Sequence, residues 1–334
     1  MARVTIRDVA DLAQVSTATV SRALSGAKPV SAAVAEQVRQ AADELGYAGN
    51  GIASALRRSR TDTVGMVVPS ITNPFFTGLV EHVEHALQDA GRQLFLCSSR
   101  SDPGLEAQRL RSLLARQVDG IVISPVHGTL STPAVQRAAA ELPLVQVDRY
   151  VTGVDSDWVG VDDDAALGLV VDHLAGLGVR SAAFVSSRLT NSSTELRVAG
   201  FRSHAQRLGI AVDPAHLLLG DYSIGWGREA AERLLATGPW PDAVVCADDL
   251  IALGVLQACT DAGVAVPGEL LVTGFDDIPF AALANPPLTT VRQPQAEIAA
   301  EAVRLLSRVL GDDPAPPSRV ALAPSLVVRA STVG

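Results

Sequence analysis

Residues 5–24 read TIRDVADLAQVSTATVSRAL, a pattern that predicts two short helices joined by a tight turn. Thr5, followed three residues later by Asp8, is typical of a capped helix start. Gln14–Val15 is the predicted turn, and Ser16 is expected to cap the second helix. The apolar residues at helical spacing, which should form the buried face of the first helix, are Ile6, Val9, Ala10 and Ala13.

The second predicted helix has a small, polar outer face. We expect it to bury Val20 and Leu24. The residues expected to face outward are Thr17, Ala18, Thr19, Ser21 and Arg22. Small polar side chains with one arginine are typical of a helix that lies in the major groove of DNA. An ordinary amphipathic hairpin explains the apolar stripe but not this outer face beside a capped turn, so DNA binding is the favoured interpretation.

Two further segments extend this unit. Ser31 is expected to cap a third helix over residues 32–45, which stops at Gly46. Residues 50–58 can form about two helical turns, too short to be stable alone in water. They carry Leu56 beside two arginines, which is typical of a segment that enters a minor groove, although an ordinary linker fits this segment equally well.

Charge is divided unevenly along the chain. Residues 1–60 hold eight basic and five acidic residues, a net charge of +3. The remainder holds 19 basic and 31 acidic residues, a net charge of −12, which gives the whole-chain value of −9. A positively charged amino-terminal segment followed by an acidic remainder predicts that nucleic acid is bound at the amino terminus.

Composition and motifs limit the function classes. The 334 residues, 48% of them hydrophobic, suffice for one small and two medium folding units. No apolar run resembles a signal peptide or reaches membrane-spanning length, so a cytoplasmic protein is expected. The three cysteines form no CxxC and are expected to be reduced. Phosphate-binding loops and metal-spaced histidines are missing, so we expect neither an enzyme nor a metal or other cofactor.

From about residue 63, short apolar runs alternate with helical patterns. Such alternation predicts a parallel sheet covered on both faces, and its restart near residue 163 predicts two similar α/β lobes. The predicted strands are 64–68, 94–97, 120–123, 144–147, 182–185, 217–219, 243–246 and 271–274. The predicted helices are 74–90, 105–116, 133–140, 163–176, 195–208, 227–236 and 250–262.

Polar and aromatic residues follow these strands. Ligands bind beyond the carboxyl ends of such sheets, so facing lobes should enclose a cleft. The residues at these ends are Phe75, Phe76, Asp148, Arg149, Tyr222, Asp248 and Asp276, with Arg197 on a following helix. Aromatic rings for stacking and charged groups for hydroxyls predict a small polyhydroxylated ligand. Taken singly, each has a structural alternative, such as a helix cap for an aspartate or a core position for a phenylalanine.

Together these motifs resemble the LacI/GalR family of transcriptional regulators over nearly the whole chain. The residues that carry the resemblance are Thr5–Ala10, Val15–Leu24, Gly46–Tyr47, Asn50, Asn73–Phe76, Asp148–Arg149, Val198–Phe201, Gly274–Asp277 and Gln293–Pro294. The resemblance implies a homodimer on a pseudo-palindromic operator, with hinge helices that insert Leu56 at the centre. It also implies a two-lobed body resembling periplasmic sugar-binding proteins, which changes DNA affinity when an effector binds. A sugar is the first expectation and a nucleoside or purine the alternative.

The resemblance also assigns roles to residues. Base contacts are implied for Thr17, Ala18 and Arg22. Phosphate contacts are implied for Thr5, Ser16, Thr19, Ser21, Ser31 and Asn50, and hinge contacts for Ala53 and Leu56. In the cleft, Arg197 and Asp276 would hold effector hydroxyls. The stacking positions are Phe75 and Tyr222, and the remaining lining is Phe76, Asp148, Arg149, Asp248 and Gln293.

Some positions depart from the family pattern. Gly49 replaces the usual proline before the hinge, and Gly51 begins it; each glycine costs a helix on the order of 1 kcal/mol relative to alanine. We therefore expect a hinge that orders only on DNA. Asp248 stands where many relatives have asparagine, so the ligand contact at this position is expected to differ in which group donates and which accepts the hydrogen bond. No heptad pattern follows Arg329, which favours a dimer over a tetramer.

The expected domains are residues 1–60, with the hinge at about 50–58, and residues 61–334. The first lobe is expected at about 62–160 and 292–320, and the second at about 161–291 and 321–330. The rival interpretations are an enzyme and a sugar-binding protein of the transport type or the cytosol. The DNA-reading head argues against both.

Overall fold

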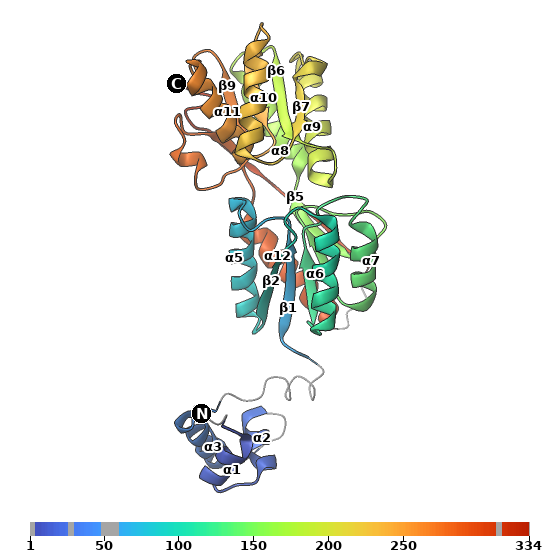
Figure 1. The fold of residues 1–334 in the computed structure, drawn as a ribbon, viewed down its shortest axis with the longest axis vertical. Coiled ribbons are helices and arrows are strands. Elements are labelled where there is room, and N and C mark those ends of the chain that lie inside the picture. The colour runs from blue at the N-terminus through green and yellow to red at the C-terminus, as the bar shows by residue number, and fades with distance from the viewer. Residues whose placement is uncertain (1–3, 26–29, 48–59, 312–315, 334) are drawn as a thin grey trace. The chain divides into compact units, whose positions relative to one another are not determined.

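The computed structural model describes residues 4–25, 30–47, 60–311 and 316–333 (Figure 1). It divides into two compact units between Asp62 and Thr63, and each is described by itself. The expected hinge, with Asn50, Ala53 and Leu56, lies outside the described residues.

The amino-terminal unit contains three helices: α1 (Ile6–Leu12), α2 (Thr17–Ser25) and α3 (Ala32–Glu44). Each begins at the capping residue that the sequence predicts. The Thr5 backbone N–H donates to Asp8 Oδ2 at 2.7 Å, while Ser16 Oγ accepts from the Thr19 N–H at 3.1 Å. Ser31 Oγ caps α3 by accepting from the Val34 N–H at 3.4 Å. The residues buried between the helices are Val9, Ala10, Ala13, Val20, Val38, Ala41 and Ala42.

One predicted core residue of this unit is wrong. Leu24 is 41% exposed, whereas Val20 is fully buried. Ala23 packs against the core in its place. Positions three and four residues along a helix share one face, so the spacing from Val20 does not distinguish Ala23 from Leu24.

The second unit consists of two lobes, each built around a six-stranded sheet (Figure 1). The strand orders are β11-β5-β4-β3-β1-β2 and β12-β10-β9-β8-β6-β7. Every pairing is parallel except that of β10 with β12. The strands of the first sheet are β1 (Thr63–Val68), β2 (Gln93–Ser98), β3 (Gly120–Ile123), β4 (Leu144–Val147), β5 (Asp157–Val161) and β11 (Arg319–Leu322). Those of the second are β6 (Ala182–Ser187), β7 (Leu217–Gly220), β8 (Ala243–Cys246), β9 (Leu271–Asp276), β10 (Thr289–Arg292) and β12 (Ser325–Val327).

Helices cover both faces of each sheet. In the first lobe α5 (Pro74–Asp89) and α12 (Gln295–Leu310) pack on one face, and α6 (Pro103–Ala115) and α7 (Thr132–Glu141) on the other. In the second lobe α10 (Ile224–Ala236) and α11 (Asp249–Ala262) pack opposite α8 (Asp163–Gly176) and α9 (Ser192–Leu208). Successive side chains of a strand point to opposite faces, so Met66 and Val67 enter different cores.

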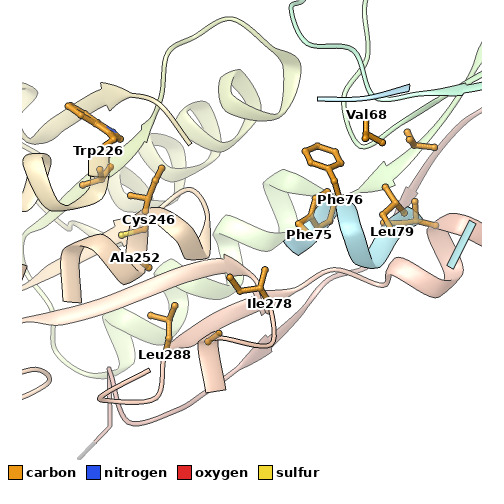
Figure 2. Close-up of a cluster of buried hydrophobic side chains, with 14 of the residues drawn as sticks. Val68, Phe75, Phe76, Leu79, Trp226, Cys246, Ala252, Ile278 and Leu288 are labelled. Atoms are coloured by element: carbon orange, nitrogen blue, oxygen red, sulfur yellow. The ribbon is translucent and has the colours of Figure 1, made fainter. Parts of the chain in front are cut away.

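The largest core continues from one lobe into the other. Figure 2 shows the part that runs from Val68 and Phe75 in the first lobe to Ile278 and Ala252 in the second. All four side chains are at most 3% exposed. The two lobes therefore share one continuous apolar core.

The sequence prediction omitted α12 and the strands β5, β10, β11 and β12. These elements carry the three crossings between the lobes, because β5 and β11 belong to the first sheet while β10 and β12 belong to the second. The lobe boundaries shift accordingly. β5 ends at Val161 rather than at 160, Arg292 still belongs to the second lobe, and β11 ends at Leu322 rather than at 320.

Candidate functional site

The residues predicted to bind DNA gather on the first turns of the three amino-terminal helices and along α2. Those exposed to solvent are Thr5, Ser16, Thr17, Ala18, Arg22 and Ser31. Thr19 and Ser21 are half-buried. Three predicted phosphate contacts, Thr5, Ser16 and Ser31, are also the helix caps. Backbone N–H groups at helix starts attract anions, so the caps lie where phosphates would be favourable.

The predicted effector residues converge between the two lobes of the body. One small cavity is lined by Asn73, Phe75, Phe76, Asp148, Arg149, Ser193, Arg197, Tyr222, Asp248 and Asp276. Eight of the nine predicted residues are in that set. The ninth, Gln293, lies behind it and donates from Nε2 to Asp276 Oδ1 at 2.7 Å. Asn73 and Ser193 were missed, although both belong to polar runs that follow strands.

Two of the aspartates at strand ends have an unusual backbone conformation. Asp148 has a φ of 59° and Asp276 a φ of 110°, both positive values that non-glycine residues rarely adopt. Such conformations are retained where surrounding structure enforces them, often at functional sites. Here they bend the chain directly after β4 and at the last residue of β9.

Arg197 is the buried anchor on the second lobe. It is 3% exposed, and its Nε donates to Asp163 Oδ1 at 2.7 Å while Nη1 donates to the Ala247 carbonyl at 2.7 Å. The guanidinium also lies 3.6 Å from the centre of the Phe275 ring. Burial lowers the pKa of Arg197, but Asp163 and the other acids nearby outweigh burial and raise it, so Arg197 stays charged.

Arg149 fills the middle of the cleft. Its guanidinium carbon lies 5.6 Å from the Phe76 ring centre and 5.2 Å from that of Tyr222, so rings from both lobes flank it. Its Nε is 3.6 Å from Asp148 Oδ2 and has no hydrogen-bond partner. Tyr222, one of the two predicted stacking positions, therefore lies against an arginine of the chain itself, as does Phe76.

Three buried acids surround the start of α11. Asp248 caps this helix by accepting from the Ile251 N–H at 2.8 Å, and burial raises the pKa of Asp248 to about 6. Burial also raises the pKa of Asp276 well above its ordinary range, although Arg197 opposes the shift. Asp249, fully buried, was not predicted as a site residue. It is identified only by its contacts, which hold the loop that follows Asp276: Asp249 accepts from the Ile278 N–H at 2.8 Å.

The lobes are held closely together. The Gly128 N–H donates to the Thr190 carbonyl at 2.7 Å, and the Tyr150 N–H donates to Ser192 Oγ at 2.9 Å. The cavity measures about 10 Å³, room for about one water molecule. Larger hollows of about 480 Å³ and 940 Å³ adjoin it through shared lining residues. Within the smallest of these spaces, a sugar-sized ligand requires movement of Arg149 or of the lobes.

Within the described part of the chain, no group of three His, Cys, Asp or Glu side chains could hold a metal ion. Nor does any helix in that part have the length and apolar character needed to cross a membrane.

Comparison with known proteins identifies the family. Residues 5–50 match the model of bacterial regulatory proteins of the lacI family, and residues 171–332 match that of periplasmic binding protein-like domains. The ribose operon repressor of Escherichia coli (strain K12) is 32% identical over 329 residues, which cover 98% of this chain and 99% of that protein. This chain belongs to the LacI family.

Other members of the LacI family align over similar lengths. The repressor PurR of Histophilus somni (strain 129Pt) is 28% identical, with 98% of each chain covered. A crystal structure of the lac repressor dimer bound to operator and the anti-inducer ONPF matches with a TM-score of 0.90, at 27% identity over the whole of both chains. A complex of the transcriptional regulator CelR with cellobiose is 33% identical, with a TM-score of 0.74 over 98% of this chain and 100% of that one.

These relatives confirm the predicted family and fold class. They also confirm the predicted function class: this LacI-family chain is a DNA-binding transcriptional repressor with an effector-binding body, and its relatives are repressors rather than enzymes.

Proposed function

We propose that this repressor binds a pseudo-palindromic operator as a homodimer and leaves it when a small sugar occupies the interlobe cleft. The observation that carries the proposal is the convergence of eight predicted side chains, from six separate segments of the two lobes, on one buried cavity. Residues so distant in the chain meet because they follow parallel strands whose carboxyl ends face each other.

On the DNA side, the exposed face of α2 is suited to base contacts. Thr17, Ala18 and Arg22 point to solvent from this helix, with the caps Ser16 and Thr5 available for phosphates. The lac repressor, similar over its whole length, was crystallised as a dimer on operator. A two-fold dimer of this chain would present two α2 helices to two half-sites.

On the ligand side, the lining favours a sugar over a purine nucleoside. Buried carboxyls and Arg197 match the hydroxyls of a sugar, whereas Arg149 occupies the space between Phe76 and Tyr222 where a base would stack. The relatives point both ways, since they include a ribose operon repressor, a cellobiose complex and PurR. A purine effector is therefore the second candidate.

Control is proposed to act by population shift. Sugar binding would change the angle between the lobes, and the change would reach the DNA through the hinge, residues 50–58, and lower operator affinity. We place this activity in the bacterial cytoplasm, where such a repressor meets its DNA.

The DNA assignment is tested with Arg22→Ala. The operator is first selected from a pool of random duplexes with the full chain. Loss of a contact worth about 1–3 kcal/mol at each half-site should weaken binding by at least about tenfold. The matched control is Arg39→Ala, which removes the same charge from the exposed surface of α3. Equal affinities of the two variants would contradict the assignment of α2 as the recognition helix.

A further inference from the structure

Acids outnumber basic groups in the interlobe cleft. Arg197 is paired with Asp163 at 2.7 Å, and Arg149 lies 3.6 Å from Asp148. The two remaining acids of the cavity lining are Asp248 and Asp276. Within the described part of the chain, neither has a basic nitrogen within 4 Å.

Two buried oxygen acceptors also lack a donor. Asp248 Oδ2 and Gln293 Oε1 have no hydrogen-bond partner, and the two residues are 2% and 3% exposed. Asp248 uses its other oxygen to cap α11, and Gln293 uses its amide nitrogen on Asp276. A buried acceptor without a donor is unfavourable, so these atoms call for hydrogen-bond donors from a bound molecule.

Each basic group nearby already has an acidic neighbour. The Nε and Nη1 atoms of Arg197 hold Asp163 and the Ala247 carbonyl, and its planar face lies on Phe275. Arg149 is held between Phe76 and Tyr222 and beside Asp148. A phosphate or carboxylate in this cavity would meet the unpaired carboxyl of Asp248 at low dielectric, where repulsion between like charges is strong.

We propose that the cleft selects its effector by charge: it accepts neutral sugars and amino sugars, whose hydroxyl and ammonium hydrogens reach Asp248 and Asp276, and it rejects sugar phosphates and sugar acids. The inference rests on the proposed function of the cleft as a sugar site. Asp248 is the discriminating residue, because its free oxygen accepts a donor and repels an anion.

The experiment measures binding of matched sugar sets to the full chain by thermal shift and titration calorimetry. Each set holds a neutral sugar with its amino, acidic or phosphorylated counterpart: glucose with glucosamine, glucuronate and glucose 6-phosphate; galactose with galactosamine and galacturonate; ribose with ribose 5-phosphate. In any set that contains a ligand, the neutral or amino member should bind at least about tenfold more tightly than the anionic member, as expected for one uncompensated charge.

Asp248→Asn removes the charge while keeping the shape, and asparagine caps a helix as well as aspartate does, so the variant should fold. We expect Asp248→Asn to weaken binding of an amino sugar by about tenfold. It should also reduce the difference in affinity between the neutral or amino member of a set and the anionic member. The matched control is Asp213→Asn, an exposed cap in the same lobe that accepts from the Ala215 N–H; it should leave both affinities unchanged.

Two adverse results are distinguishable. An anionic sugar that binds wild type as tightly as its neutral parent, and loses binding in Asp276→Asn, would overturn charge selection while supporting the cleft as the effector site. If no sugar of the panel binds while operator binding is intact, the result would contradict the proposed sugar effector and, with it, the proposed selection by charge.

Discussion

At the residue scale, Asp249 shows how a buried acid can shape the cleft without lining it. Its Oδ1 accepts from Thr290 Oγ1 at 2.6 Å and its Oδ2 from the Ile278 N–H at 2.8 Å. These bonds join the start of α11 to β10 and to the loop that follows β9. Asp276 is the last residue of β9. Burial raises the pKa of Asp249 to about 8, although the bond from Thr290 opposes the shift.

This shift predicts that the body loses stability as pH rises. With its pKa raised from 3.8 to about 8, Asp249 holds its proton in the folded state between these values, whereas the unfolded chain does not. Its stabilising contribution is present below about pH 4 and is lost as pH rises through 8. We expect the free energy of unfolding of wild type to fall by on the order of a few kcal/mol between pH 5 and 8.5. Asp249→Asn should reduce this fall.

Urea unfolding at several pH values measures this decline. All three tryptophans, Trp158, Trp226 and Trp240, belong to the body, so their fluorescence reports on that unit alone. Asp248 and Asp276, whose pKa values burial also raises, should leave a residual slope in the variant. Identical slopes in wild type and Asp249→Asn would show that Asp249 is not the titrating group.

At the element scale, glycine lets α10 and α11 approach closely. A Cβ on Gly227 would lie 2.0 Å from the Ile251 carbonyl oxygen, and one on Gly254 would lie 2.0 Å from that of Ile224. Both clashes are with backbone, which cannot move aside as a side chain can. The contact positions α11, and with it the cap Asp248, against the cleft.

Gly254→Ala should therefore force the two helices apart. We expect a loss of unfolding free energy of about 3 kcal/mol or more, as for an overpacked core. Gly225→Ala is the control, because it lies in α10 with open space around it; alanine there should be neutral or stabilise by up to about 1 kcal/mol. Tryptophan fluorescence in urea compares both variants with wild type, and similar midpoints for all three would rule out a tight contact.

At the scale of the whole molecule, three chain crossings and the shared core join the lobes, and hydrogen bonds also run between them. Gly128 and Tyr150 of the first lobe donate to Thr190 and Ser192 of the second. The cavity on which the predicted residues converge measures only about 10 Å³. Ligand entry into this cavity must change contacts around Arg149 or between the lobes, and a change between the lobes is what coupling to DNA requires.

Coupling of this kind must be reciprocal. If the sugar identified in the matched sets weakens operator binding by a given factor, operator must weaken sugar binding by the same factor, expected at about 5- to 150-fold. Titrations of sugar with and without operator, and of operator with and without sugar, measure both factors in the full chain. Unequal factors would mean that the two ligands do not act through one equilibrium.

Sequence patterns predicted the amino-terminal helices, their caps and most strands of the body. Such features depend on residues within a few positions of one another, because helix propensity and the spacing of hydrophobic residues are local properties of the sequence. Position after a parallel strand also predicted eight of the ten residues that line the cavity. The missed strand β5 reads DWVGV and begins with an acid, so its five residues carry too weak a pattern to be recognised.

Long-range packing determined the rest. Arg149 meets Phe76 and Tyr222, which lie on different lobes and are each 73 positions from Arg149 in the chain, and no local pattern predicts these contacts. The same holds for the exposure of Leu24 and for the bond of Asp249 to Thr290, 41 residues away. Local spacing specifies which helices and strands form, but the free energy of a buried charge depends on every group around it, and those groups are assembled only in the folded body.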